Sequence, residues 1–84
     1  MNLKVKSPVF IDRLTFELNH PHSCFIKAVL IDDKGSICSA LETEVKTGQQ
    51  VLDWEGLSEL PYGEYTLEIL GGSKEMKVKL VKRV

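Results

Sequence analysis

Three potential metal ligands lie close together in this sequence of 84 residues: His20, His22 and Cys24. In an extended chain their spacing of two places all three on one face, where imidazole nitrogens and a thiolate could bind one metal ion. However, Pro21 lies between the histidines and favours a turn, and structural zinc sites usually require four ligands. We therefore expect solvated loop histidines and no bound metal.

Two further groups of side chains could serve a ligand. The paired carboxylates of Asp32 and Asp33 could bind calcium, but aspartates at the start of a turn that ends in Gly35 are typical turn formers. Trp54 could offer an indole platform to a sugar if it were exposed. Its position at the end of an expected strand predicts that it is mostly buried instead.

No stretch of the chain resembles an enzyme motif. A glycine-rich phosphate loop, a nucleophile elbow and a His-Glu-x-x-His pattern are all missing from the sequence, which predicts a protein without enzymatic activity or cofactor. Residues 32–68 carry nine acidic and two basic side chains, whereas residues 74–84 carry five basic and one acidic. Because no aromatic residue lies among those lysines, we expect a solvated edge strand and no nucleic-acid partner. No apolar run approaches the roughly 20 residues of a transmembrane segment.

Most of the chain alternates apolar and polar residues with a period of two, the pattern of strands with one buried face. Turn residues separate these segments at intervals of 8–12 residues. About seven strands are expected, covering residues 3–6, 14–18, 23–32, 37–45, 51–55, 65–70 and 76–80. The sequence therefore predicts one domain over residues 1–84, an all-β, Ig-like antiparallel β-sandwich.

Two segments do not follow the simple alternation. Residues 23–32 are continuously apolar and could form a buried helix, but their β-branched and aromatic content favours a central strand. If Lys27 of that strand faces outward, Val29 and Ile31 are partly exposed. Residues 56–60 are expected to form a single helical turn that places Leu57 and Leu60 over one end of the core.

The alternation also predicts the core and the state of the cysteines. Pairing about the turn at residues 32–35 sets Cys38 near Val29 and Cys24 near Thr43, so that the two sulfurs lie more than about 10 Å apart. We therefore expect two small buried thiols in place of a disulfide. The predicted core consists of Leu14, Phe16, Leu18, Ile26, Ala28, Leu30, Tyr65, Leu67, Ile69, Met76, Val78 and Leu80.

The last quarter of the chain reads as a β-hairpin, and we expect it to carry the function. Pro61 and Gly63 mark a turn, because proline fixes φ and glycine tolerates positive φ. The first strand of the hairpin then ends at Gly71-Gly72, and the second follows it with alternating lysines and apolar residues.

Four pieces of the sequence together resemble a known family. They are Ser7-Pro8-Val9-Phe10-Ile11-Asp12-Arg13-Leu14, the hairpin Ile31-Asp32-Asp33-Lys34-Gly35, the motif Leu60-Pro61-Tyr62-Gly63-Glu64-Tyr65, and the terminal Lys77-Val78-Lys79-Leu80-Val81-Lys82. In this order the chain resembles the type IX secretion sorting domain, the C-terminal β-sandwich of exported Bacteroidetes proteins. It departs from the family in keeping only Pro8 of a Pro-Asn-Pro lead, and in continuing through Lys82-Arg83-Val84 after the aliphatic pair.

The resemblance implies a non-enzymatic sorting signal that directs a passenger protein across the outer membrane to the cell surface or the medium. The implied partners are an outer-membrane translocon, a sortase and an upstream passenger domain, with Met1 marking an excised piece of a longer secreted protein. The implied recognition residues are Gly63, Tyr65, Lys79, Leu80, Val81 and Lys82, with residues 79–84 as the part that a partner reads. The alternative is an Ig-like or fibronectin-like extracellular module that binds carbohydrate or protein.

Overall fold

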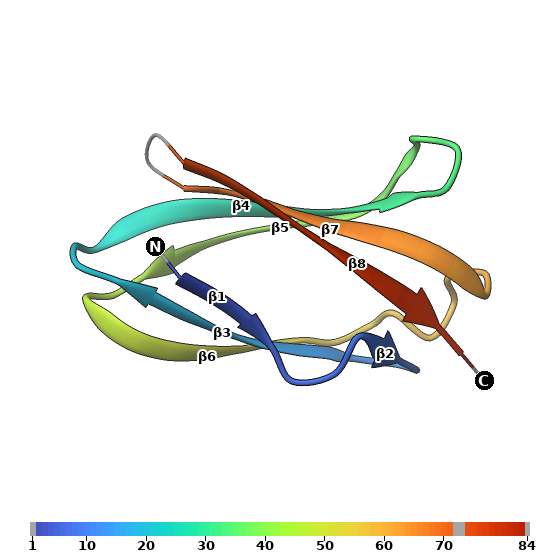
Figure 1. Ribbon diagram of the computed structural model, residues 1–84, viewed down its shortest axis with the longest axis horizontal. Coiled ribbons are helices and arrows are strands. Elements are labelled where there is room, and N and C mark those ends of the chain that lie inside the picture. Colours follow the sequence, from blue (N-terminus) through green and yellow to red (C-terminus); the bar gives the residue numbers. More distant parts are fainter. Residues whose placement is uncertain (1, 72–73, 84) are drawn as a thin grey trace.

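The computed structural model describes residues 2–71 and 74–83, and every regular element in them is a β-strand (Figure 1). The strands are β1 Asn2–Val5, β2 Val9–Phe10, β3 Leu14–His20, β4 Cys24–Asp32, β5 Ile37–Val45, β6 Gly48–Trp54, β7 Gly63–Gly71 and β8 Lys74–Lys82. Within these residues there is no helix long and apolar enough to cross a membrane.

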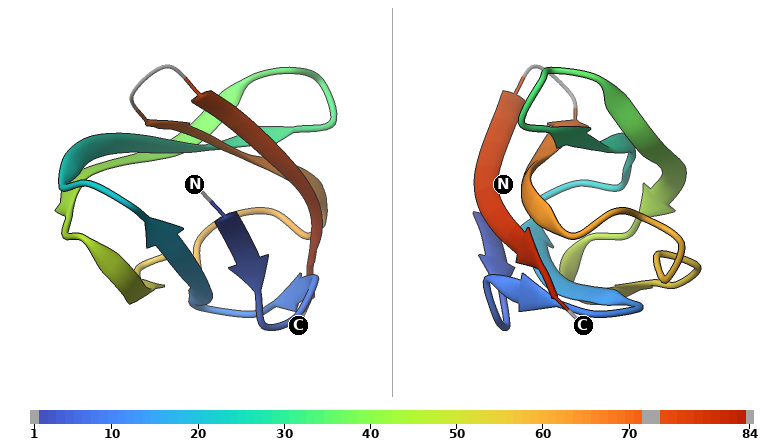
Figure 2. Two further views of the ribbon diagram at one scale, coloured as in Figure 1. Left: turned by 60° about the vertical axis from the view of Figure 1, so that its left-hand side comes forward. Right: turned by 90° about the vertical axis from the view of Figure 1, so that its right-hand side faces the viewer.

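The strands form two packed sheets, seen as two layers in Figure 2. One sheet has the order β1-β3-β6 and the other has the order β2-β8-β7-β4-β5. The predicted all-β, Ig-like sandwich is therefore confirmed, with eight strands where the sequence suggested about seven.

The additional strand, β2, joins the N-terminal segment to the end of the chain. It pairs in parallel with β8, with Val9 opposite Val81, whereas β1 pairs antiparallel with β3 in the other sheet. The chain changes sheets at Ser7-Pro8, where proline has no N–H to continue a ladder. Two residues are too few for a period of two to be recognised, which is why β2 escaped the sequence prediction.

The core lies between the layers and largely follows the alternation. Ten of the twelve predicted core residues are buried, whereas Met76 and Val78 are half-buried. Both lie on β8, and the wider sheet extends beyond the three strands packed against it, so this strand is only partly covered. Val29 was expected to be partly exposed but is only 6% exposed, because it lies on the interior strand β4 between Ala40 and Glu68.

The pairing of β4 with β5 differs from the expected register. Cys24 pairs with Val45 and Val29 pairs with Ala40, and the register shifts between Leu30 and Ile31. The expected neighbours, Thr43 for Cys24 and Val29 for Cys38, were therefore wrong by two residues. Ile31 pairs with Ile37, so the turn is one residue longer than expected, and the bulge adds the second residue. Both thiols are free, as predicted, and half-buried where full burial was expected.

The segment after β6 closes one end of the core. Trp54 ends β6 and is 6% exposed, as predicted. Leu57 is fully buried, while Leu60 is half-buried and donates its N–H to the carbonyl oxygen of Leu57 at 3.2 Å. This single bond makes a hydrogen-bonded turn and not the helical turn that was predicted, since no helix is present at these residues. The N–H of Leu57 is bonded to the carbonyl oxygen of Asp12 at 3.1 Å.

Candidate functional site

The terminal hairpin of β7 and β8 is the longest uninterrupted pair of strands in the described residues. Nine residue pairs run from Gly63–Lys82 to Gly71–Lys74 without a bulge. Alternation turns Leu67 and Val78 toward the core and Lys77 and Lys79 toward the outer face. The predicted hairpin is therefore confirmed; Gly72 of its expected Gly-Gly link lies outside the described residues.

Gly63 and Tyr65 fix the start of the hairpin. Gly63 has a φ of 139°, which a residue with a side chain rarely adopts. The Tyr65 side chain is 4% exposed, donates its hydroxyl to the carbonyl oxygen of Pro61 at 2.7 Å, and packs edge-to-face on Phe10. Burial raises the pKa of Tyr65, so its phenol stays protonated as the donor. Immunoglobulin-like sandwiches use a comparable tyrosine to fix a corner.

The four remaining predicted recognition residues divide between surface and interior. Lys79 is exposed, Val81 is half-buried and Leu80 is fully buried. Lys82 is only 3% exposed; its Nζ lies 5.2 Å from the centre of the Tyr62 ring and 3.5 Å from the carbonyl oxygen of Arg83. Among these four side chains only Lys79 therefore presents a free charge to a partner, while Leu80 and Lys82 position the strand. Val84, the last residue of the segment expected to be read, lies outside the described residues.

The outer edge of β8 is covered at one end only. Val81 donates its N–H to the carbonyl oxygen of Pro8 at 2.8 Å, and Arg83 donates to that of Phe10 at 2.9 Å. Because backbone groups alternate along a strand, those of Glu75, Lys77 and Lys79 point to the same edge. In the described part of the chain β2 pairs only with Val81 and Lys82, so the edge from Glu75 to Lys79 is open to another strand.

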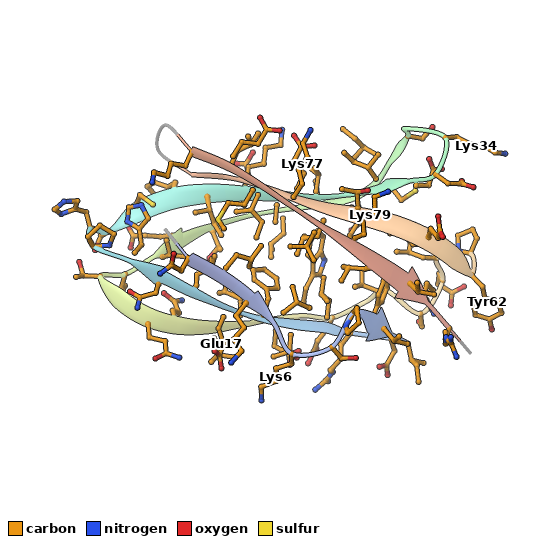
Figure 3. The ribbon with its side chains drawn as sticks, viewed as in Figure 1. Lys6, Glu17, Lys34, Tyr62, Lys77 and Lys79 are labelled. Carbon is orange, nitrogen blue, oxygen red and sulfur yellow. The ribbon has the colours of Figure 1, made fainter. Side chains whose placement is uncertain are left out.

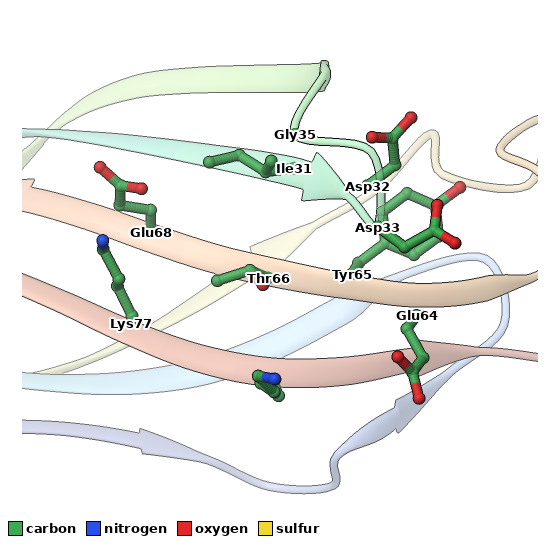
Figure 4. A pocket seen from close by; sticks show the side chains of 10 residues that line it. Ile31, Asp32, Asp33, Gly35, Glu64, Tyr65, Thr66, Glu68 and Lys77 are labelled. Atoms are coloured by element: carbon green, nitrogen blue, oxygen red, sulfur yellow. The ribbon is translucent and has the colours of Figure 1, made fainter.

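A groove on the outer face of the larger sheet lies beside this edge (Figure 4). It has a volume of about 610 Å³, and its lining includes Ile31 and Thr66 together with Glu64, Glu68 and Lys77. Lys77 pairs across the strands with Glu68, and the two side chains point to the same side of the sheet in Figure 4. Such a groove of mixed charge suits an extended polar segment better than a small apolar ligand.

The histidines and Cys24 do not form a common site. His20 Nδ1 contacts the backbone of His22, lying 3.1 Å from its nitrogen and 2.5 Å from its carbonyl oxygen, and His20 Nε2 lies 3.9 Å from the Cys24 sulfur. The His22 side chain is exposed in the loop. Across residues 2–71 and 74–83, no group of three or more His, Cys, Asp or Glu side chains is arranged to hold a metal ion.

The aspartate pair acts in the turn between β4 and β5. Asp32 Oδ1 accepts the N–H groups of Lys34 at 2.9 Å and Ser36 at 2.8 Å. The bond from Ser36 is the main reason that the pKa of Asp32 lies below its ordinary value. Burial raises the pKa of Cys38, whose sulfur lies 3.7 Å from Asp32 Oδ2, so this thiol is not activated as a nucleophile. Gly35 has a φ of 86° and completes the predicted turn.

Comparison of the chain with models of known protein families gives no match, and comparison with curated protein sequences gives none either.

Proposed function

We propose that this domain is a non-enzymatic sorting domain of the type IX secretion kind. In this proposal it directs an upstream passenger across the outer membrane, is read by the translocon and sortase of that pathway, and reaches the cell surface or the medium. The proposal begins with the sequence resemblance, and the terminal hairpin adds a structural argument to it.

The observation that carries the proposal is that some side chains of β8 are buried and fix the strand, whereas others are exposed to a partner. Leu80 and Lys82 are buried and hold the strand against the core and Tyr62, while Lys79 and the open edge before it face outward. A receptor that serves many passengers needs features that belong to the tag alone. The backbone groups and lysines of a fixed strand supply such features. The proposed signal is thus the folded surface of β8 and not a flexible tail.

Because β8 contains both buried and exposed residues, a test of the proposal must change an exposed one. Removing residues 79–84 deletes the buried Leu80, so loss of export could simply reflect unfolding. Lys79→Glu reverses an exposed charge and leaves the core intact. Lys6→Glu, at an exposed lysine that directly follows β1 of the other sheet, is the matched control; Figure 3 shows Lys6 and Lys79 on opposite layers of the sandwich.

The experiment fuses residues 1–84 to a fluorescent cargo with a signal peptide, in a host that has type IX secretion. We expect the unchanged domain and Lys6→Glu to carry cargo to the cell surface, and Lys79→Glu to leave most of it in the periplasm. Retention of cargo by the unchanged domain, confirmed to be folded, argues against a sorting role.

The second candidate is an Ig-like binding module, and the groove beside Lys77 favours it. Trp54 is buried and cannot act as a sugar platform, whereas the Tyr62 ring is 63% exposed. A module of this kind would bind a partner without directing export. Failure of export together with saturable binding of a polysaccharide or peptide in the groove would favour this candidate.

A further inference from the structure

The two outermost long strands of the five-stranded sheet carry opposite charges. Exposed Lys77 and Lys79 lie along β8, and exposed Glu42 and Glu44 lie along β5. Among the described residues no strand pairs with the far side of β5, and only β2 pairs with the far side of β8, at one end. Charged edges keep like surfaces apart, but edges of opposite charge can attract one another.

The directions of the strands allow these two edges to pair between copies. β8 is antiparallel to β7, β7 to β4, and β4 to β5, so that β5 runs antiparallel to β8. Two copies lying side by side in the same orientation bring β5 of one against β8 of the next. The two strands then meet as an antiparallel pair that continues the sheet.

The backbone groups of the two edges also match. The bond from Val81 to Pro8 shows that the odd-numbered residues of β8 direct their N–H and C=O groups toward the open edge. The same alternation can be followed through the paired strands β7 and β4 to β5. There it directs the backbone N–H and C=O groups of Glu42 and Glu44 toward the open edge. Lysine and glutamate residues can therefore occupy directly opposed, hydrogen-bonded positions.

The charges agree in one register. That register sets Lys79 opposite Glu42 and Lys77 opposite Glu44, and it brings Glu75 level with Lys46, which directly follows β5. Within one copy Glu75 and Lys77 form an exposed ion pair at 3.2 Å, which this register extends to the neighbouring strand. A shift by two residues in one direction sets Glu75 against Glu44, and a shift in the other direction sets Lys77 against Lys46. Like charges directly opposite one another are unfavourable, so only the first register is complementary throughout.

The inner face supports the same pairing independently. Met76 and Val78 of β8 are half-buried, since the smaller sheet does not cover them fully. In the complementary register Met76 faces Val45 and Val78 faces Thr43 of the neighbouring copy. Pairing thus removes part of the exposed apolar surface of β8 from water.

We propose that this domain associates head to tail with further copies of itself, β8 of one copy pairing with β5 of the next. Each added copy leaves one free edge of each kind, so the assembly is open-ended and does not close as a symmetric dimer. β2 limits the contact to residues 75–79 of β8. The proposal goes beyond the sorting function and does not depend on it, although a receptor on the same edge and a second copy would exclude one another.

Two proline variants test the pairing one edge at a time. Lys77→Pro removes an N–H that points to the open edge of β8, and Glu42→Pro does the same on β5, so neither removes a hydrogen bond within the sheet. By sedimentation velocity, we expect the mass of the unchanged domain to rise with concentration in low salt and to fall in high salt. Each proline variant alone should remain monomeric. An equimolar mixture should form dimers and nothing larger, because each dimer joins the one intact β8 to the one intact β5.

Charge variants provide the second test should a proline variant fail to fold by circular dichroism. Lys79→Glu alone and Glu42→Lys alone each place like charges opposite one another and should lower the association at least tenfold. Mixing the two restores opposite charges at every contact between unlike copies and should recover association. The proposal is overturned if the unchanged domain stays monomeric up to millimolar concentration. It is also overturned if neither set of variants changes its association.

Discussion

The Tyr65 hydroxyl donates a hydrogen bond of 2.7 Å to the carbonyl oxygen of Pro61, four residues earlier in the chain. This bond closes the Pro61–Gly63 turn over the buried ring and sets the point at which β7 begins. The hairpin that carries the proposed recognition surface therefore starts from a fixed corner.

Removal of this hydroxyl should destabilise the domain modestly. Tyr65→Phe keeps the ring packed on Phe10 but loses the hydrogen bond, so the free energy of unfolding should fall by about 1 kcal/mol. Urea unfolding followed by circular dichroism measures the change. Tyr62→Phe, at an exposed ring, is the matched control and should change stability by less than half as much. Equal effects of the two substitutions would contradict a special role for the corner.

Truncation at the centre of the core should cost much more. Leu67 is completely buried on β7, so Leu67→Ala should lower the free energy of unfolding by about 2–5 kcal/mol. For a domain of this size that is a large part of the total. Val51→Ala, at a side chain that is 54% exposed, serves as the control in the same unfolding experiment. A loss below 1 kcal/mol at Leu67 would mean that the core is packed differently.

Protonation of Asp32 should contribute to the loss of stability at low pH. Its folded-state pKa is lowered from 3.8, mainly by the N–H of Ser36, so its contribution is present above pH 3.8 and disappears as pH falls through the folded-state pKa. Asp32→Asn should therefore flatten the loss of stability below about pH 4. Thermal unfolding between pH 2 and pH 6 measures it, with Asp33→Asn, an exposed neighbour, as the control. An unchanged acid limb in Asp32→Asn would refute the assignment.

Protein purified without affinity metals should contain no stoichiometric zinc or copper. The backbone of His22 already occupies Nδ1 of His20, which leaves His20 Nε2 and the Cys24 sulfur as the two potential metal ligands close to one another. Tight structural sites need about four. Elemental analysis tests this expectation, and one equivalent of either metal would show that the loop rearranges to complete a site.

Most of the strands could be predicted because they bury one face, so that alternation along the chain reflects the packing directly. Strand β4, with Ala28, Val29 and Leu30 all buried, was predicted from its β-branched and aromatic content instead. The features that were missed depend on contacts between distant segments. β2 is defined only by its pairing with β8, and the burial of Val29 only by the strands on either side of β4. The residues opposite the two cysteines depend on the turn length and on a bulge between β4 and β5, and no residue type in the sequence indicates either.

The hairpin that forms the candidate site was predicted from the sequence, but the directions of some of its side chains were not. Lys82 was expected to face a partner, yet it has the same parity along β8 as Val78 and Leu80, and the structure places it inside. The position of Lys82 in the alternation indicated that it faces inward, but its charge led to the opposite prediction. The half-exposure of Met76 has no such signal, since it follows from the unequal widths of the two sheets.

The parallel pairing of β2 with β8 gives the domain a mechanical property. The chain enters β2 from the N-terminal side and leaves β8 toward the C-terminus, so a force that separates the chain ends pulls the two strands along each other in opposite directions. The bonds from Val81 to Pro8 and from Arg83 to Phe10 then carry load together as a shear clamp. They cannot be opened one after the other, as in an unzipped hairpin. Tension from the N-terminal side acts first on the pairing of β1 with β3 and then on this junction, which also holds the last strand in place.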